Sequence, residues 1–262
     1  MTTKQHKDHI REQVRTHYSE IAKENSSCCG RSCCGSTTLD NTAITTRLGY
    51  TNNELSAVPK GSNMGLGCGN PQAIAQMKPG DIVLDLGCGG GFDCFLAAKQ
   101  TGAKGKVIGV DMAPEMLEKA RKNARKGDYS NVEFRLGEIE HLPVADNSVD
   151  IIISNCVINL SPDKEQVFRE TYRVLKSNGR LAVSDVVAIT PLPDDVQQNI
   201  DAYCGCVAGA IQANEIEQML RDVGFSEVTI EIKEDGKQLI GDWFPGSGME
   251  KYVRPAMIAA VK

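Results

Sequence analysis

Three cysteines stand in segments that are far apart in the chain, two of which are rich in glycine. They are Cys68 in the motif GLGCGNP, Cys156 in SNCVINL and Cys206 in CGCVAGA. Thiolates are the ligands that soft, thiophilic ions prefer, and neighbouring thiols can also exchange electrons by forming disulfides. Free cysteine is also among the most buried residue types, so packing is the competing interpretation. Their loop positions and glycine neighbours favour one shared site, to which three separate segments each bring a thiol.

Composition affects how these cysteines are interpreted. The chain has 262 residues, ten cysteines and a net charge of -5. That charge, without a run of basic residues, argues against a nucleic-acid or membrane partner. The N-terminus lacks the apolar stretch of a signal peptide, and no segment reaches the ~18 apolar residues of a membrane span. We therefore expect a cytoplasmic protein, in whose reducing compartment cysteines bind soft ions or do redox chemistry more often than they form disulfides.

A glycine-rich motif, VLDLGCGGG at residues 83–91, has the composition of a ligand-binding turn. A buried strand leads into this turn, and a helix follows it from near Phe92. Glycines let the backbone approach a ligand closely at the carboxyl end of a strand, where open α/β sheets bind ligands. The second strand ends at Asp111, which is 111 − 91 = 20 residues beyond Gly91. An acidic residue at this distance is expected to bind ribose hydroxyls.

Two cofactor classes use a glycine turn of this kind. A nicotinamide-binding fingerprint, Gly-x-Gly-x-x-Gly, would place Gly or Ala at position 92, where this chain has Phe92. The glycines follow Asp85 instead, at positions 87, 89 and 91. This spacing resembles the first motif of the class I S-adenosylmethionine (SAM) methyltransferases. The resemblance implies SAM as the cofactor, bound by Asp85, Gly87, Gly89, Gly91, Asp111 and Met112.

Two later segments fit the same resemblance. The segment LGEIEHLP at residues 136–143 matches the family's third-strand loop. In that loop an acidic residue takes the adenine amino group and an apolar residue covers the ring, and we assign these roles to Glu138 and Ile139. The fourth strand, at residues 148–155, ends at Asn155, on the side that faces the methyl donor in this fold.

Short apolar runs alternate with helical stretches from Asp81 onward, which predicts an α/β fold with a doubly wound, mostly parallel, Rossmann-like sheet. Strands are predicted near Ile82, Val107, Val132, Val149 and Leu181, and at 228–232 and 256–261, the last two completing the sheet. Helices are predicted at 4–24, from Pro114, from Ser161-Pro162 to Asn178-Gly179, and near 194–203 and 214–223.

We divide the chain into three segments. Residues 1–70 are expected to hold an N-terminal helix and a cysteine-rich extension, with a long connecting region over 25–70. Residues 71–190 form the SAM-binding methyltransferase core. Residues 191–262 contribute cap helices over the ligand edge of the sheet and the terminal strands.

The three cysteine motifs resemble those of the arsenite SAM methyltransferases, and they come in the same order. The similarity covers most of residues 60–225. It implies that Cys68, Cys156 and Cys206 bind trivalent arsenic and act in its methylation by SAM. It also implies that arsenite arrives as a thiol adduct, and that a thiol reductant such as thioredoxin or glutathione is a partner. We therefore interpret the chain as an enzyme of arsenite detoxification.

The chemistry of trivalent arsenic agrees with this interpretation. Three thiolates hold this soft ion pyramidally and leave its lone pair free to attack the sulfonium methyl in line. No general base is needed, which fits a chain with only four histidines, three of them within the first seventeen residues. Because the transfer oxidises arsenic formally to the pentavalent state, neighbouring thiols return electrons by forming a disulfide, which an external thiol then resets.

Four further cysteines cluster near the N-terminus, namely Cys28, Cys29, Cys33 and Cys34. The arsenite methyltransferases generally have a fourth functional cysteine in this region, so these four are further candidate arsenic ligands or relay thiols. The spacing of Cys29 and Cys33 also fits a structural zinc site, although a second ligand pair is not recognisable. A solvated, redox-labile tail is the third interpretation, and the sequence does not choose among them.

Two other functions are alternatives to arsenite methylation as interpretations of the sequence. A methyltransferase for a small organic acceptor, such as a quinone or an amine, would leave Cys156 as packing and would work without a metalloid. A non-catalytic metalloid-binding protein would not need the complete set of Asp85, the glycine turn and Asp111, which argues against it. Cys88 and Cys94 lie inside the first strand–helix unit, where we expect ordinary burial.

Overall fold

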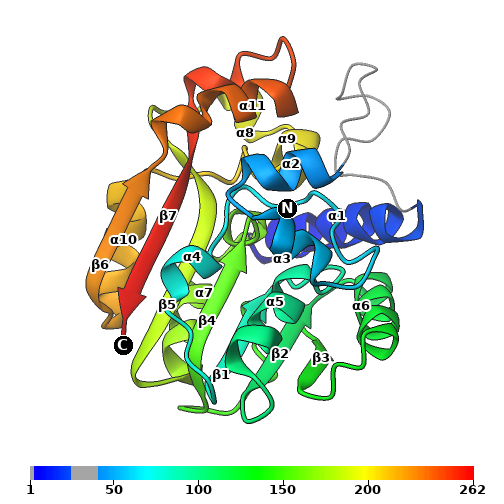
Figure 1. Ribbon diagram of the computed structural model, residues 1–262. Helices are drawn as coiled ribbons and strands as arrows, with labels where there is room; N and C mark the ends of the chain where they lie inside the picture. Colours follow the sequence, from blue (N-terminus) through cyan, green and yellow to red (C-terminus); the bar gives the residue numbers. More distant parts are fainter. Residues whose placement is uncertain (1–2, 25–40) are drawn as a thin grey trace.

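A seven-stranded mixed sheet forms the centre of the protein in a computed structural model, which describes residues 3–24 and 41–262. The strand order is β3-β2-β1-β4-β5-β7-β6, with β1 to β5 parallel and β7 antiparallel to both of its neighbours (Figure 1). The strands are β1 (Ile82–Leu86), β2 (Lys106–Asp111), β3 (Val132–Leu136), β4 (Val149–Asn155), β5 (Leu175–Ala188), β6 (Ser226–Ile232) and β7 (Val253–Val261). The predicted α/β fold, including its terminal pair of strands, is confirmed.

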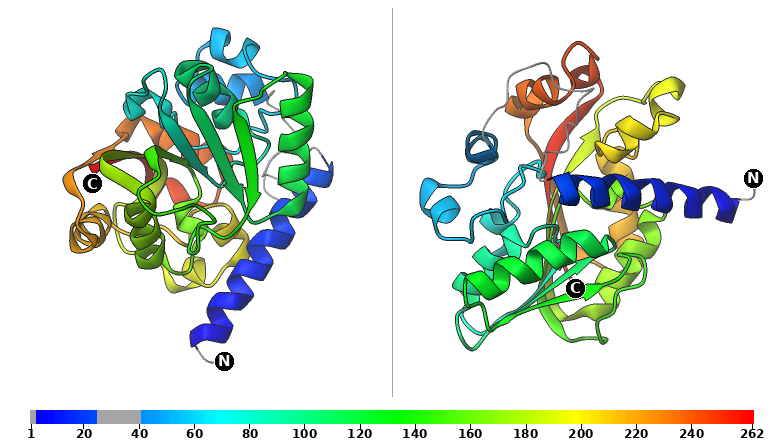
Figure 2. Two further views of the ribbon diagram at one scale, coloured as in Figure 1. Left: turned by 90° about the horizontal axis from the view of Figure 1, so that it is seen from below. Right: turned by 90° about the vertical axis from the view of Figure 1, so that its right-hand side faces the viewer.

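Helices cover both faces of this sheet, because successive residues of each buried strand point to opposite sides. Val83 packs into the cluster formed with α5 and α6, whereas Leu84 packs with α7 and α10. Figure 2 shows these helical layers on either side of the sheet. The α-helices that follow the N-terminal one are α2 (Asn41–Arg47), α3 (Asn52–Ser56), α4 (Gln72–Ala75), α5 (Phe92–Thr101), α6 (Pro114–Lys126), α7 (Lys164–Val174), α8 (Asp194–Gln197), α9 (Ile200–Cys204), α10 (Ala213–Val223) and α11 (Lys237–Trp243). Three short 3-10 helices accompany them, namely η1 (Ile158–Leu160), η2 (Glu234–Gly236) and η3 (Met249–Lys251).

The N-terminal helix α1 (Thr3–Glu24) lies against α6 and α9, beside the carboxyl ends of the central strands (Figures 1 and 2). Its thin apolar stripe makes this contact, with Val14 and Ile21 both buried. At its start, the Lys7 ammonium donates to Asp163 at 2.6 Å. The helix predicted at residues 4–24 is confirmed, and its stripe packs onto the rest of the molecule as expected.

The start of helix α7 differs from the prediction, which placed the cap at Ser161. The helix begins at Lys164 and is capped by Asp163, whose carboxylate accepts a hydrogen bond from the backbone N–H of Gln166 at 3.4 Å. Ser161 ends η1 instead, and its hydroxyl donates to the buried carboxylate of Glu140 at 2.7 Å. The Ser161 oxygen also accepts from the backbone N–H of Asp163 at 3.0 Å, so this hydroxyl serves both the turn before the helix and the contact with Glu140.

The end of the same helix also differs, because α7 stops at Val174 and not at the Asn178-Gly179 pair. Strand β5 begins directly after it, and its pairing with β4 shifts register between Val149 and Ile151. Asn178 takes a left-handed backbone (φ 63°), and its N–H donates to the carbonyl of Lys262 at 2.8 Å. The Asn-Gly pair thus marks an irregularity within a strand and not a helix end.

The C-terminal third contains more helices than the sequence predicted. The helix expected near 194–203 is split into α8 and α9, because the Asn199 side chain accepts from the N–H of Ala202 at 2.9 Å and starts a new helix. Helix α11 was not predicted, and neither were α2 and α3 in the expected connecting region. The described part of the chain contains no helix long and apolar enough to cross a membrane.

Candidate active site

A pocket opens at the carboxyl ends of β1, β2 and β4, where the glycine motif lies. The backbone of the turn between β1 and α5 is left-handed at Gly87 (φ 64°) and Gly89 (φ 49°). Glycine adopts this conformation without the steric cost that other residues meet. A Cβ at Gly87 would come within 2.5 Å of Val157, whereas the space beside Gly89 is open. The turn therefore presents bare backbone and the N-terminus of α5 to the pocket, as a polar ligand requires.

Most of the residues predicted to hold the cofactor lie in the wall of this pocket. Those that line it are Asp85, Gly87, Gly89, Asp111, Met112, Ile139 and Asn155.

Two predicted cofactor residues, Gly91 and Glu138, are not part of the wall. Gly91 precedes α5 and lies so close to Phe95 that a Cβ would come within 2.8 Å of its ring. Glu138 pairs with Arg11 of α1 at 3.7 Å. Glu140, which accepts from Arg11 at 3.1 Å, lines the pocket instead. Gly91 therefore shapes the helix start, and Glu140 is the acidic residue of this loop that faces the cavity.

Asp111, at the end of β2, already accepts two backbone hydrogen bonds. Its oxygens accept from the N–H groups of Gly89 and Ala113, both at 2.9 Å. Burial raises the pKa of Asp111, and these N–H donors oppose that shift. A carboxylate oxygen has two lone pairs, so each can accept a further bond from a ribose hydroxyl. The contact with Gly89 also fixes the glycine turn to the neighbouring strand.

Two further acidic residues, Asp85 and Asp93, lie in the same wall of the pocket. Burial, and after it the charge of Asp93, raises the pKa of Asp85 well above its usual range. The Tyr50 hydroxyl donates to Asp93 at 2.7 Å. Among the residues that line the pocket, Arg11 is the only basic one. A wall rich in buried carboxylates fits a ligand that carries positive charge, as SAM does on its ammonium and sulfonium groups.

The three predicted cysteines, Cys68, Cys156 and Cys206, meet in one buried cluster. The Cys206 thiol donates to the carbonyl of Cys156 at 2.9 Å, and the Cys68 sulfur lies 3.4 Å from the Ser184 hydroxyl. Hydrogen bonds with the Cys206 and Cys68 thiols, followed by burial, raise the pKa of Cys156 well above the usual range. The pKa of Cys206 is raised as well, although its hydrogen bond with Cys156 opposes the contribution of burial.

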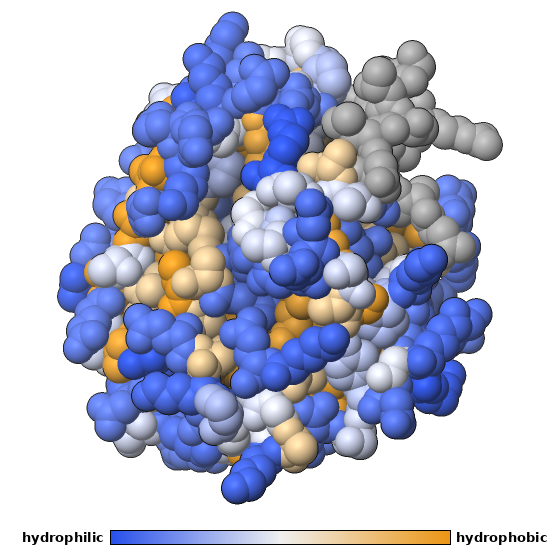
Figure 3. Space-filling view, viewed as in Figure 1, coloured by the Kyte–Doolittle hydropathy of each residue, from blue (hydrophilic) through white to orange (hydrophobic). Residues whose placement is uncertain are grey.

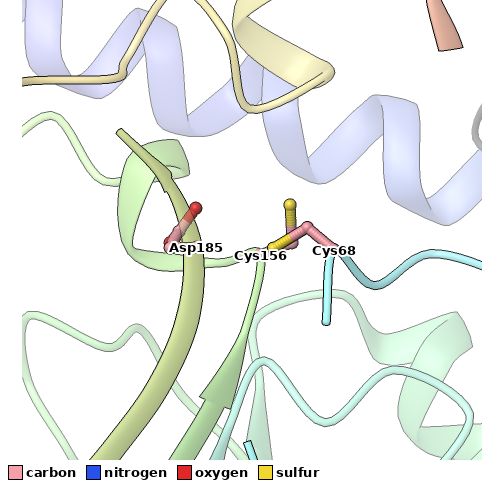
Figure 4. A group of neighbouring side chains, drawn as sticks. All are labelled: Cys68, Cys156 and Asp185. Carbon is pink, nitrogen blue, oxygen red and sulfur yellow. The ribbon is translucent and has the colours of Figure 1, made fainter. Parts of the chain in front are cut away.

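Cys156 also lines the cofactor pocket, which places the thiols directly beside it. In Figure 4, Cys68 from the loop before α4, Cys156 from the end of β4 and Asp185 from β5 lie next to one another. One ligand atom from each of these three residues lies within 4.8 Å of the other two.

Two of these cysteines have a strained backbone. Cys156 and Cys206 are left-handed, with φ of 60° and 64°. For a residue other than glycine this conformation costs on the order of 1–3 kcal/mol, and such strain tends to occur at functional sites. The N–H of Cys156 donates to the carbonyl of Ser184 at 2.8 Å, and that of Cys206 donates to Tyr203 at 2.9 Å. These bonds hold both residues in place, so the thiols are oriented by the fold.

The side chain of Asn155 joins the pocket to the cysteine cluster. Its oxygen accepts from the N–H of Cys68 at 2.9 Å. Its amide nitrogen donates to the carbonyl of Gly69 at 2.8 Å, and lies 3.1 Å from the Tyr50 hydroxyl and 3.3 Å from Asp93. One carboxamide thus positions both the Cys68 loop and the acidic wall of the pocket.

Several residues of the site were not found from the sequence: Tyr50, Asp93, Glu140, Asn159, Lys164 and Asp185. Burial raises the pKa of Asp185 to about 6, and burial lowers the pKa of Lys164 to about 8. These residues come from several different elements, which meet only in the folded chain. The one signal was an acidic residue near the carboxyl end of β1, β2 and β5, a place where side chains meet the ligand edge.

Figure 3 shows a mostly hydrophilic face, with apolar side chains in small separate groups. The exposed large apolar residues in the described part of the chain are Leu136, Ile189 and Ile200. Scattered residues of this kind are normal on soluble domains. Cys88 and Cys94 are buried as expected, although Cys88 also borders the pocket. Cys28, Cys29, Cys33 and Cys34 lie outside the described residues.

Comparison with known proteins gives consistent results. Residues 77–224 match the family model described as a methyltransferase domain. An arsenite methyltransferase of Halobacterium salinarum is 49% identical over 97% of this chain and 67% of its own length. One from Aquipseudomonas alcaligenes is 38% identical over 83% of this chain and 62% of its own length.

A solved structure adds the same relationship in three dimensions. An arsenic(III) S-adenosylmethionine methyltransferase from Chlamydomonas reinhardtii superposes with a TM-score of 0.61 and 35% identity, covering 83% of this chain and 72% of that one. The chain therefore spans about two thirds of the length of the curated relatives that it matches.

Proposed function

The chain belongs to the arsenite methyltransferase family of SAM-dependent enzymes, and from this membership we propose that it transfers the methyl group of SAM to trivalent arsenic held by Cys68, Cys156 and Cys206. The observation that carries the proposal is the meeting of these three cysteines in one buried cluster, of which Cys156 lines the cofactor pocket. Ordinary packing of three cysteines would require neither the shared contacts nor the left-handed backbone at two of them.

The residues that would hold SAM are those of the pocket wall. Asp111 would bind the ribose hydroxyls, Ile139 and Met112 would contact the adenine ring, and Asp85 with Asp93 would bind the ammonium group, since all five line the pocket. When bound, SAM supplies a methyl group on a positively charged sulfonium. These assignments agree with the charge of the wall, whose buried carboxylates lack a matching set of cations among the lining residues.

Loading of arsenic needs no general base, although hydrogen bonds and burial raise the pKa of Cys156. Each thiol proton leaves on the group that it displaces, as water from arsenous acid or as free thiol from an arsenite–thiol adduct. The overall exchange with such an adduct converts As(SR)3 and three protein thiols into protein-bound arsenic and three RSH. Soft arsenic favours the protein's three converging sulfurs over separate ones, because binding them together costs less entropy.

Pyramidal coordination by three thiolates leaves the arsenic lone pair on the remaining side, and the chain orients that side. Cys156 borders the pocket, so we place the lone pair toward the methyl donor. The protein's main contribution is to hold the two reacting atoms at near-attack distance and to exclude water. The Cys68 loop, fixed by Asn155, sets one of the three sulfur positions.

We further propose that an external thiol, such as thioredoxin or glutathione, resets the cysteines after transfer, and that the enzyme works in the cytoplasm. Support comes from the redox balance, since arsenic is formally oxidised by methylation and the cluster thiols are free in the structure. Thiols remain reduced in that compartment. The N-terminal cysteines Cys28, Cys29, Cys33 and Cys34 are candidates for arsenic capture or for the relay.

The test is product analysis by mass spectrometry after incubation with As(III), SAM and glutathione. We expect methylated arsenic together with S-adenosylhomocysteine, in amounts that require both substrates. Reactions without arsenic, or with a small quinone or amine as acceptor, are the controls. Consumption of SAM on an organic acceptor, without methylated arsenic, would contradict the proposal.

A further inference from the structure

Asp185 is a buried carboxylate beside the thiols that the steps above do not use. It belongs to β5 and is 2% exposed. One of its oxygens lies within 4.8 Å of both the Cys68 and the Cys156 sulfur (Figure 4). Cys156 lines the cofactor pocket and Asp185 does not. The carboxylate therefore adjoins the thiols without being part of the pocket wall.

The orientation of this carboxylate is fixed by N–H donors. Asn159 donates to it through its side-chain amide at 2.9 Å and through its backbone N–H at 3.3 Å, and the Val186 N–H donates at 2.8 Å. The Lys164 ammonium acts on it over a longer distance. Donors of this kind favour the ionised form of a buried carboxyl. Asp185 is thus a preorganised negative charge next to the proposed arsenic site.

Methyl transfer moves a positive charge toward this group, an argument that rests on the proposed function. Arsenic bound by three thiolates is neutral overall. Its lone pair forms the As–C bond while the C–S bond of the sulfonium breaks, and the electron pair of that bond stays on the cofactor sulfur. The cofactor becomes neutral, and the positive charge passes to the methylated arsenic. Charge therefore moves from the pocket side of Cys156 into the cluster that Asp185 adjoins.

We propose that Asp185 stabilises the positive charge that develops on arsenic in the transition state. A fixed carboxylate in a buried site acts strongly on nearby charge, because little water screens it and it needs no reorientation during the reaction. Before transfer the positive charge is on the cofactor, in the pocket whose wall does not include Asp185, so the carboxylate favours the transition state over the bound substrates. The group therefore raises the rate of transfer without tightening binding.

The test compares Asp185→Asn with the wild-type enzyme in single-turnover, acid-quench assays of methyl transfer at pH 8, with arsenic and SAM both prebound. We expect the rate constant to fall by at least about tenfold. Affinities for As(III) and for SAM, measured by calorimetry, should change by less than about threefold. A readout independent of activity is the thiolate absorbance at 240 nm of the protein without ligands. Its titration midpoint should move to lower pH, because Asp185 no longer opposes ionisation of Cys206.

Three variants complete the experiment. Asp185→Glu keeps the charge and should recover much of the lost rate. Asp185→Ser is a second neutral variant for use if the Asn protein does not fold, which thermal unfolding will show. Asp150→Asn is the matched control, because Asp150 lies at the start of β4, whereas Cys156 follows the end of this strand. This variant should behave like the wild type.

The outcomes separate this inference from the proposed function. A wild-type enzyme that makes no methylated arsenic contradicts the proposed function itself. A wild-type enzyme that methylates arsenic, with a folded neutral Asp185 variant that transfers the methyl group equally fast, overturns the role of Asp185. A neutral variant that loses As(III) affinity to the same degree as rate would make Asp185 a structural support of the thiols.

Discussion

The cofactor pocket and the cysteine cluster adjoin at Cys156, yet they are built in different ways. The glycine turn of the pocket takes its shape within residues 85–91, from a strand, a run of glycines and a helix start. The cluster joins residues that are separated by 156 − 68 = 88 and 206 − 156 = 50 positions. Backbone geometry makes the first site, and the packing of distant segments makes the second.

This difference predicts how each region responds to substitution. The pocket binds through backbone groups and several carboxylates, so loss of one side chain should weaken it by a limited amount. The cluster depends on three sulfurs whose positions are fixed by a strained backbone and by single hydrogen bonds. Loss of one sulfur should therefore remove arsenic chemistry while leaving SAM binding nearly intact.

Cys156→Ser should give the largest effect and tests whether the two regions are separable. Serine is almost isosteric, but a hard, un-ionised hydroxyl cannot replace a thiolate on arsenic. We expect arsenic methylation to fall by at least about a hundredfold, equivalent to about 2.7 kcal/mol in barrier. SAM affinity measured by calorimetry should be near normal, because the pocket wall keeps its shape.

The matched variants are Cys206→Ser and Cys88→Ser. The first should behave like Cys156→Ser, and the second, which alters a thiol of the glycine turn, should keep arsenic methylation. Robust methylation by the Cys156 and Cys206 variants would remove these thiols from the mechanism and would bring the organic-acceptor hypothesis to first place.

Asp111→Ala tests the opposite side of the comparison. It removes the predicted acceptor for the ribose hydroxyls and the carboxylate that binds the N–H of Gly89. We expect SAM binding to weaken by about 1.5–3 kcal/mol, as for a hydrogen bond to a charged group. Binding of As(III) to the thiols should be unchanged in the same calorimetric experiment, and an unchanged SAM affinity would exclude the ribose assignment.

Asn155→Ala should affect the cofactor pocket and the cysteine cluster at the same time, because this carboxamide contacts both regions. Truncation leaves the N–H of Cys68 and the Asp93 carboxylate each without one partner. We expect affinities for SAM and for As(III) to fall together, each by about 1–2 kcal/mol. Asn131→Ala is the matched control, since its amide donates to Ala98 and Gly102 away from the site. A loss confined to one ligand would show that Asn155 belongs to one region only.

Glu115→Gln should have the smallest effect, on the docking of α1 beside both regions. A hydrogen bond from Ser19, followed by Lys23, lowers the pKa of Glu115 from 4.5 to about 2. A lowered pKa in the folded state gives stability that is present above pH 4.5 and is lost as the pH falls from 4.5 toward 2.

Urea unfolding at several pH values measures this contribution. At pH 7 the substitution should lower the free energy of unfolding by only about 0.5 kcal/mol, because the ion pair of Glu115 with Lys23 is largely open to solvent. The difference between the variant and the wild type should disappear as the pH approaches 2. A difference that stays constant down to pH 2 would mean that packing of α1, and not the charge of Glu115, is responsible.

The sequence by itself determined those features that depend on local chemistry. Short apolar runs and the turn residues that bound them predicted all seven strands, because a buried strand between two turns is specified within a few residues. The glycine spacing predicted the cofactor turn, since a left-handed backbone there depends on the glycines themselves. The cysteine motifs predicted which thiols meet, through their resemblance to a family and not through a spacing rule.

The tertiary structure alone decided the partners of those residues. Asp185 in β5 and Tyr50 before α3 reach the site only on folding, and Asp93, two residues beyond Gly91, gains Tyr50 and Asn155 as partners only there. Ser161 is the cap that the local sequence predicts, but the folded chain is capped at Asp163, and the Ser161 hydroxyl donates to Glu140. The physical reason is the same in each case. Local geometry depends on a residue and its near neighbours, whereas burial, charge and hydrogen bonding depend on segments that the chain brings together only on folding.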